Sequence, residues 1–178
     1  MLRKEGGNVY AILIDLDLAV NVDAQSPSSK HRMGTKPFTA IDLLSEESTE
    51  HLHRHDLESL FYVVVWITSR FQDGKEIPNT PLQGWAEGKH QRVVDSKSAF
   101  LSTLAPLPTK GFASFGRHIY RLRRMFHDGC EARTKAIEDS ILDSGLEGGP
   151  KTSQFANDML GGFVTFDTFQ RILDTDLP

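Results

Sequence analysis

Asp15 is the first residue of the chain whose position suggests chemistry. It follows an apolar run in Ala11-Ile-Leu-Ile-Asp-Leu-Asp-Leu-Ala19, a pattern typical of a buried strand. An acid at the end of such a strand can deliver its carboxylate to a hard cation such as Mg²⁺. In phosphoryl transfer, a carboxylate of this kind holds the magnesium ion that bridges the nucleotide phosphates. Such an acid is also a common turn or cap residue, so Asp15 taken alone leaves both interpretations open.

Two further segments follow Asp15 in a fixed order. They are Gly34-Thr-Lys-Pro-Phe-Thr-Ala-Ile-Asp42 and Arg54-His-Asp-Leu-Glu-Ser-Leu-Phe-Tyr-Val-Val-Val-Trp-Ile67. Together with the strand, they closely resemble the fungal-type protein kinase family, strongly from Val9 to Phe71 and weakly beyond. The resemblance implies transfer of the terminal phosphate of ATP to a protein hydroxyl, with Mg²⁺ and ATP as cofactors and a protein as substrate.

The resemblance also assigns roles to individual residues. Asp15-Leu16-Asp17 matches the kinase Asp-Phe-Gly motif, which makes Asp15 the magnesium ligand and puts Asp17 in place of the glycine hinge. Gly34 and Thr35 resemble the substrate-side loop of the activation segment. Asp42 ends the counterpart of Ala-Pro-Glu, and Asp56 matches the aspartate that opens the large central helix, so both are expected to be structural.

Several kinase motifs are not found upstream of Asp15. The residues before it contain no Gly-rich loop, no strand lysine and no His-Arg-Asp catalytic loop. His53-Arg54-His55-Asp56 resembles that loop, but it follows the metal aspartate and has Phe61 where the loop needs an asparagine. We therefore expect no catalytic residue within this chain, and negligible phosphoryl transfer by the chain alone.

The predicted fold is mainly α with a short N-terminal β element, as in an incomplete kinase-like C-terminal lobe without the N-terminal lobe. One partial domain would span residues 1–178, with the metal-site strand and activation segment in 1–44 and the helical lobe in 45–178. The strand is expected over Val9 to Leu18, with a partner in Met1 to Arg3 or none. The remaining predicted elements are a turn beginning at Ser45, helices over His55 to Phe71 and Phe112 to Asp128, a helix pair within Trp85 to Leu104, a linker from Gly145 to Ser153, and a closing helix capped by Asp167 or Thr165.

Composition limits the partners and the compartment. The chain has 178 residues, a formal net charge of −4 and 39% hydrophobic residues, so it offers no basic field for nucleic acid or anionic membrane. One cysteine excludes an internal disulfide framework, and no apolar run resembles a secretory signal or a membrane span, so we expect an intracellular protein. That cysteine, Cys130, is interpreted as a packing residue.

Three side-chain clusters are candidate sites. The alternating His51, His53 and His55 could bind zinc, but without a second cluster they are interpreted as cap and surface residues. The hydroxyls of Ser26, Ser28 and Ser29 lie where a kinase carries its activating phosphate, but a Ser-rich loop is more often solvated without being modified, so both interpretations stay open. The arginines of the predicted helix over 112–128 are interpreted as a solvated face, and one of two, Arg117 or Arg121, is expected to pair with Asp42.

The sequence is compatible with two functions from different classes. The first is a fragment of a serine/threonine-type protein kinase domain, in which Asp15 would bind the magnesium ion. Magnesium-dependent nucleotide binding would favour this function. The second is a non-catalytic, pseudokinase-like interaction module, in which an exposed apolar face of the lobe binds a partner protein or another copy of the chain.

Overall fold

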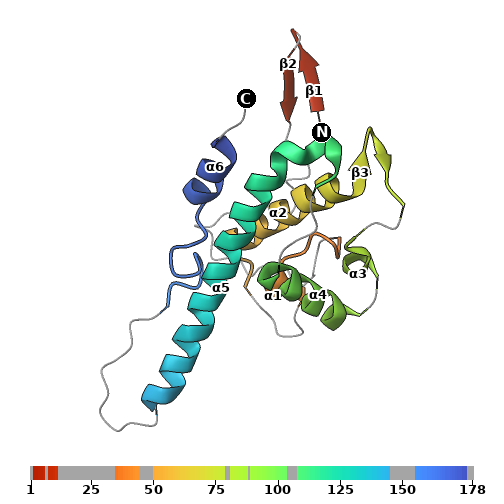
Figure 1. Cartoon of the computed structure of the whole chain (residues 1–178). Coiled ribbons are helices and arrows are strands. Elements are labelled where there is room, and N and C mark those ends of the chain that lie inside the picture. The colour runs from red at the N-terminus through yellow and green to blue at the C-terminus, as the bar shows by residue number, and fades with distance from the viewer. Residues whose placement is uncertain are drawn as a thin grey trace. The chain divides into compact units, whose positions relative to one another are not determined.

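The computed structural model describes residues 2–6, 8–11, 35–44, 50–78, 81–87, 89–103, 108–144 and 155–175 (Figure 1). The described residues are mainly helical, as the sequence predicts. The chain forms two compact units, Met1–His31 and Arg32–Pro178, and each is described by itself. Within the described residues, no helix is both long and apolar enough to cross a bilayer.

The first unit contains a β-hairpin. Strand β1 (Leu2–Glu5) pairs antiparallel with β2 (Asn8–Ala11), so that Leu2 lies opposite Ala11 and Glu5 opposite Asn8. Gly6 in the turn has a φ of 58°, a conformation that glycine adopts without a steric penalty. The strand predicted from Val9 therefore exists and has a partner near the N-terminus. Its continuation to Leu18 lies outside the described residues.

The second unit is built around helix α2 (His53–Arg70), which confirms the predicted central helix and begins two residues earlier. Its apolar side chains pack in an aromatic cluster, because ring faces and edges fill the space between helices with large apolar areas. The Phe61 ring stacks on Phe126 with centroids 5.3 Å apart, and the Tyr62 ring meets Trp85 edge-on at 5.0 Å. Trp85 in turn contacts Phe100 at 5.1 Å.

These rings come from four helices of the unit. Besides α2, they belong to α3 (Gln83–Ala86), α4 (His90–Ser102) and α5 (Gly116–Ser144). Of the helix pair predicted within 85–104, α4 is present, whereas α3 is a single turn that begins before this range, at Gln83. Helices α2, α4 and α6 (Phe166–Asp174) all pack against α5, the longest helix in Figure 1.

Helix α5 differs most from its prediction. It has 29 residues and continues to Ser144, whereas the apolar pattern suggested an end at Asp128. Gly129 looks like a terminator in the sequence, but inside the helix it is buried against Leu160 and Phe163. Beyond it, good helix formers such as Ala132 and Ala136 extend the helix without an apolar stripe. A 3₁₀ helix, η2 (Lys110–Phe115), precedes it.

Shorter elements connect the helices. Strands β3 (Phe71–Gln72) and β4 (Lys75–Glu76) form a hairpin directly after α2. Its turn residues, Asp73 and Gly74, have φ values of 51° and 74°, which is typical of the tight turns that join two strands. The sequence predicted a helix break at this point but not the hairpin. The turn predicted at Ser45 and the linker predicted over 145–153 lie outside the described residues.

Candidate functional site

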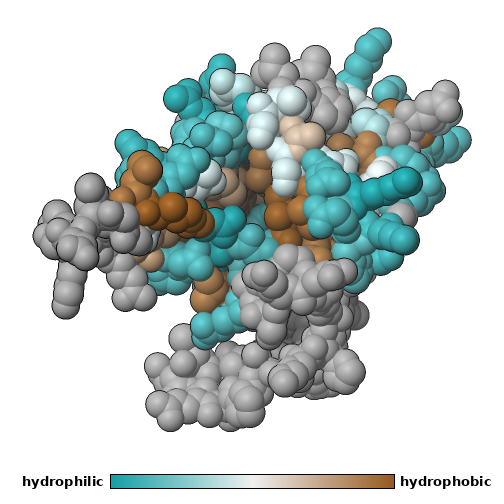
Figure 2. Space-filling model, turned by 90° about the horizontal axis from the view of Figure 1, so that it is seen from below, coloured by the Kyte–Doolittle hydropathy of each residue, from teal (hydrophilic) through white to brown (hydrophobic). Residues whose placement is uncertain are grey.

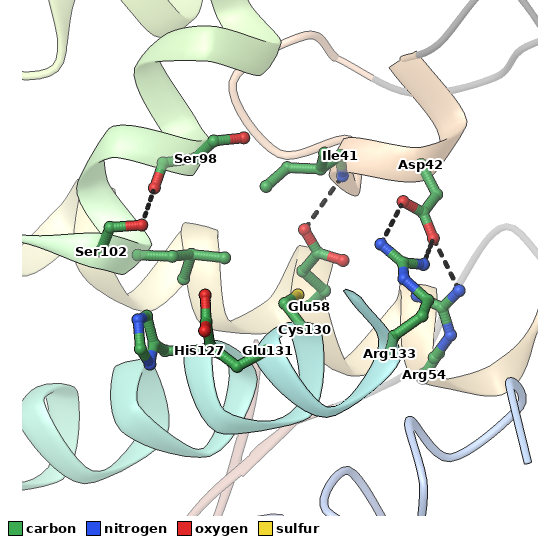
Figure 3. A pocket seen from close by; sticks show the side chains of 11 residues that line it. Ile41, Asp42, Arg54, Glu58, Ser98, Ser102, His127, Cys130, Glu131 and Arg133 are labelled. Atoms are coloured by element: carbon green, nitrogen blue, oxygen red, sulfur yellow. Dashed lines mark hydrogen bonds and ion pairs between the residues drawn. The ribbon is translucent and has the colours of Figure 1, made fainter. Parts of the chain in front are cut away.

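The most highly connected group in the second unit surrounds Asp42 on helix α1 (Ile41–Leu44). Arg133 of α5 donates to both carboxylate oxygens of Asp42, from Nη1 to Oδ2 at 2.6 Å and from Nη2 to Oδ1 at 3.2 Å. Arg54 of α2 donates from Nη2 to Oδ2, also at 2.6 Å (Figure 3). Two-pronged guanidinium contacts of this kind are among the strongest hydrogen bonds that a carboxylate can accept. They fix α1 against α2 and α5.

The surroundings of Asp42 keep its carboxylate ionised. Burial by itself would raise the pKa of Asp42, but His55, Arg133 and Arg54 outweigh burial and hold this pKa well below its usual range. The Nδ1 atom of His55 accepts a hydrogen bond from the Leu52 backbone N–H at 3.0 Å. A neutral His55 ring therefore carries its proton on Nε2, which lies 3.8 Å from Asp42 Oδ2.

Arg54 connects this group to the C-terminal part of the unit. Its side chain is buried, and Nε donates to the backbone carbonyl of Asn157 at 2.7 Å. One guanidinium therefore bridges Asp42 and the turn at 157–160, although Arg54 and Asn157 are 103 residues apart in the sequence. An arginine suits this task because its planar fork presents several donors in a fixed geometry.

Glu58 holds the start of the same short helix. Its Oε1 atom accepts hydrogen bonds from the Ile41 backbone N–H at 2.9 Å and from the Tyr62 hydroxyl at 2.7 Å. The Ile41 N–H is a helix-terminal donor without a partner inside α1, so a buried carboxylate satisfies it. Glu58 lies on α2, four residues after Arg54, which places both side chains toward α1.

Lys97 of α4 contacts the segment just before α1. Its Nζ atom donates to the backbone carbonyls of Thr39, at 2.5 Å, and Lys36, at 3.3 Å. The side chain is fully buried and lies over the Tyr62 ring, with Nζ 4.1 Å from the ring centroid. Residues 36–42 are therefore held by side chains of α2, α4 and α5.

A hollow of about 140 Å³ lies beside this group, between α1, α2, α4 and α5 (Figure 3). Its lining includes Ile41, Glu58, Ser98, Ser102, Cys130 and Glu131. Burial raises the pKa of the Cys130 thiol to about 11, so Cys130 stays protonated near neutral pH and is a poor nucleophile. The structure thus agrees with the interpretation of Cys130 as a packing residue.

The predicted site residues are only partly described. Asp15 and Gly34 lie outside the described residues, so their predicted roles stay predictions. Thr35 is exposed, and its carbonyl accepts the Phe38 N–H at 2.8 Å. Asp42 is the centre of the ion-pair network. Asp56 is a first-turn acid of α2, exposed, with Oδ1 2.8 Å from Nε2 of His51. Within the part of the chain that the structure describes, no three His, Cys, Asp or Glu side chains cluster tightly enough for a metal ion.

The arginine predictions need correction. The partner of Asp42 on α5 is Arg133, not Arg117 or Arg121, because those residues lie about 24 and 18 Å further back along the helix at 1.5 Å per residue. Arg123 is not solvated either, since it is buried and donates to the Leu101 carbonyl. The error came from the helix end predicted at Asp128, which left Arg133 outside the helix.

Sequence reasoning missed Arg54, Glu58 and Lys97 as partners of this segment. Arg54 and Glu58 follow the spacing i, i+4 on the central helix, a signal that two charged side chains share the face turned toward α1. Lys97 gives no such signal, because a lysine in an amphipathic helix is usually solvated.

The comparisons with known proteins bear on the first part of the chain. The sequence model of the fungal protein kinase family matches residues 1–68, which confirms the resemblance for this region. The matched region contains Asp15, Gly34, Thr35, Asp42 and Asp56 and ends within α2. No curated protein and no solved structure matches the chain.

Proposed function

We propose that these 178 residues are part of a fungal-type protein kinase domain, whose reaction transfers the terminal phosphate of ATP to a hydroxyl of a protein substrate. The proposal is supported by the family match over residues 1–68 and, above all, by the anchoring of Asp42. A kinase needs its substrate-side segment fixed in one conformation, because positioning accounts for most of phosphoryl-transfer catalysis. The network around Asp42 provides such a fixed end.

The proposed roles follow the order of the segments. Asp15 would bind the magnesium ion, Gly34 and Thr35 would shape the loop that meets the substrate, and Asp42 and Asp56 would be architectural. No three potential ligands cluster among the described residues, so the magnesium role depends on Asp15, which lies outside them. Magnesium, when bound, would neutralise charge on the nucleotide phosphates.

The remaining catalytic groups would come from outside this sequence. The general base, the phosphate-binding lysine and the second metal ligand have no counterpart in the residues before Asp15. Without these groups, the chain alone is expected to be inactive, since most of the positioning and electrostatic stabilisation is missing.

The first experiment reads the messenger RNA through and beyond the codon for Met1. We expect the open frame to continue upstream into a strand lysine and a His-Arg-Asp loop with its asparagine. The protein from that frame should phosphorylate a generic protein substrate, and Asp15→Asn should abolish this activity while Asp139→Asn, at an exposed site on α5, should not. A transcript that begins at the Met1 codon, or activity that survives Asp15→Asn, contradicts the proposal.

A specific observation favours a second candidate, a pseudokinase-like interaction module. On the last turns of α5, Ile137, Ile141 and Leu142 are 54%, 67% and 69% exposed. Figure 2 shows hydrophobic side chains gathered in separate patches among hydrophilic ones on the face seen from below. Exposed apolar groups of this kind can mark a binding surface. Tight self-association of the purified chain, unaffected by magnesium and nucleotide, would favour this candidate over the first.

A further inference from the structure

A buried lysine in contact with the segment before α1 is the most unusual feature of the second unit. Lys97 is 0% exposed, and lysine is among the residues that are rarely fully buried. Its Nζ atom lies 4.1 Å from the centroid of the Tyr62 ring and 5.4 Å from that of Trp85. A methionine or leucine would fill the same space without the cost of removing an amino group from water. The lysine therefore needs an explanation beyond packing.

The explanation lies in what the amino group touches. Lys36 lies inside a turn in which the Phe38 N–H donates to the Thr35 carbonyl at 2.8 Å, and Thr39 follows directly after this turn. Pro37, inside this turn, has no N–H of its own and is buried. Lys97 thus supplies donors to two backbone acceptors from another helix, and an amine has at least two N–H groups in either protonation state.

The neighbouring contacts make Lys97 one end of a continuous clamp. Lys97 holds the carbonyls of residues 36 and 39, Glu58 holds the N–H of Ile41, and Arg133 holds the carboxylate of Asp42. Before Ala40, the segment is held from α4 by Lys97 and from α2 by the edge contact between the Phe38 and Trp66 rings, whose centroids are 5.8 Å apart. The Asp42 network fixes the other end of the segment, beyond the turn.

We propose that Lys97 is a positioning residue that sets the conformation of residues 35–40. Because this segment is the substrate-side loop of the proposed kinase, the inference deepens the proposed function and rests on it for the identity of the loop. Lys97 acts through the backbone of the loop and not on the reacting atoms. Removing its amino group should loosen the loop without unfolding the helices that surround it.

Hydrogen exchange of individual backbone amides tests this inference. The reporters are the N–H groups of Phe38, Thr39 and Ile41, each of which donates within the clamp. In Lys97→Met, we expect these amides to exchange about 10- to 100-fold faster, because two backbone carbonyls of the segment lose their donor. The exchange rates of the Phe61 and Val65 amides in α2 should change only as much as the change in global stability requires. Lys135→Met, an exposed lysine on α5, should change neither set.

A chemical rescue separates positioning from packing. In a Cys130→Ala background, Lys97→Cys is alkylated in denaturant with 2-bromoethylamine, which yields a side chain of lysine length that ends in an amino group. Alkylation with 1-bromopropane gives the same length without the amine. The aminoethyl protein should exchange at 38–41 like its Cys130→Ala parent, and the propyl protein should exchange faster. Equal exchange in the two proteins, or a uniform increase across all amides, overturns the inference.

This readout needs neither nucleotide nor catalysis, so it is independent of the Asp15 experiment. If exchange at 38–41 does not respond to the amine, Lys97 has no positioning role, and the kinase assignment is untouched. If exchange responds but the Asp15 experiment fails, Lys97 positions residues 35–40, but these residues do not contact a kinase substrate. The part of the inference that assigns them to the substrate-side loop is then wrong.

Discussion

Asp42 and Arg133 lie 91 residues apart in the sequence, yet the two terminal nitrogens of the arginine reach both oxygens of the carboxylate. Arg54 adds a third contact from a different helix. Helix α1 has four residues, far fewer than an isolated helix needs to be stable in water. Its conformation therefore depends on these tertiary contacts, and Asp42 is the residue through which they act.

Replacing Asp42 with asparagine should destabilise the second unit. The amide keeps the size of the side chain but leaves Arg54 and Arg133 without a compensating charge in a partly buried site. We expect the free energy of unfolding to fall by about 2–4 kcal/mol in urea titrations. Asp139→Asn, at an exposed position on α5, should change it by less than about 0.5 kcal/mol. Equal effects of the two substitutions would show that the Asp42 contacts contribute nothing to stability.

The same carboxylate should control acid stability. The pKa of Asp42 in the folded protein lies well below that of an ordinary aspartate, about 3.8. Its contribution is therefore fully present above pH 3.8 and is lost as the pH falls below that value, because the unfolded chain binds the proton first. Unfolding monitored by circular dichroism should show a shallower stability loss below pH 4 in Asp42→Asn than in wild type. Parallel curves would contradict this.

How far the sequence predicts this structure differs between local and long-range features. Helix α2 follows from the nearly continuous apolar run after Asp56, and the closing helix with Thr165 or Asp167 as its cap follows from short polar residues at the start of an amphipathic turn; the structure shows Thr165 as the cap. These signals lie within one element. The helix end at Ser144 did not follow, because Gly129 resembles a terminator until Leu160 is seen against it.

The network of the candidate site was predictable only in part. That Asp42 needs an arginine from a late helix follows from the kinase resemblance, but which arginine depends on where α5 begins and ends. The pairing of Lys97 with the carbonyls of Lys36 and Thr39 depends on tertiary contacts across about 60 residues. No sequence period encodes a contact of a side chain with a distant backbone group.

Gly129 should be intolerant of a side chain. A Cβ atom built there would lie 2.9 Å from Leu160 Cβ and 3.3 Å from Phe163 Cβ. Gly129→Ala should therefore lower the free energy of unfolding by about 1–3 kcal/mol, even though alanine favours the helix by about 1 kcal/mol. Urea titration measures the loss, and limited proteolysis should cut residues 155–164 faster in the variant.

Gly116→Ala provides the matched control on the same helix. At the first residue of α5, an added Cβ would meet nothing closer than Pro108, at 3.9 Å. Here the helix preference acts alone, so stability should rise slightly or stay the same. If both alanine variants behave alike, the close approach of Leu160 to α5 is not what limits position 129.

Thr165 should stabilise the protein by capping the start of helix α6. Its Oγ1 atom accepts the Thr168 backbone N–H at 3.1 Å, which satisfies one donor at the start of α6. Thr165→Ala should cost about 1 kcal/mol in unfolding free energy, and Thr165→Ser, which keeps the hydroxyl, should recover most of it. A serine variant as unstable as the alanine variant would assign the loss to the methyl group instead.

Lys97 should give the protein a stability that rises with pH. Burial lowers the pKa of Lys97 from 10.5 to about 7, whereas Glu58 nearby opposes this shift. Between pH 7 and 10.5 the unfolded chain then binds a proton that the folded protein lacks, so the stability contribution increases with pH, by at most about 1.4 kcal/mol per pH unit.

Cys130, with its pKa raised to about 11, acts in the opposite direction at high pH. The informative quantity is therefore the difference between wild type and Lys97→Met in urea titrations from pH 6 to pH 9. Above pH 7, the free energy of unfolding of wild type should increase relative to that of Lys97→Met. The free energy of unfolding of Lys135→Met should follow that of wild type across the whole range. A constant difference across this range would show that Lys97 has the same pKa in the folded and unfolded chain.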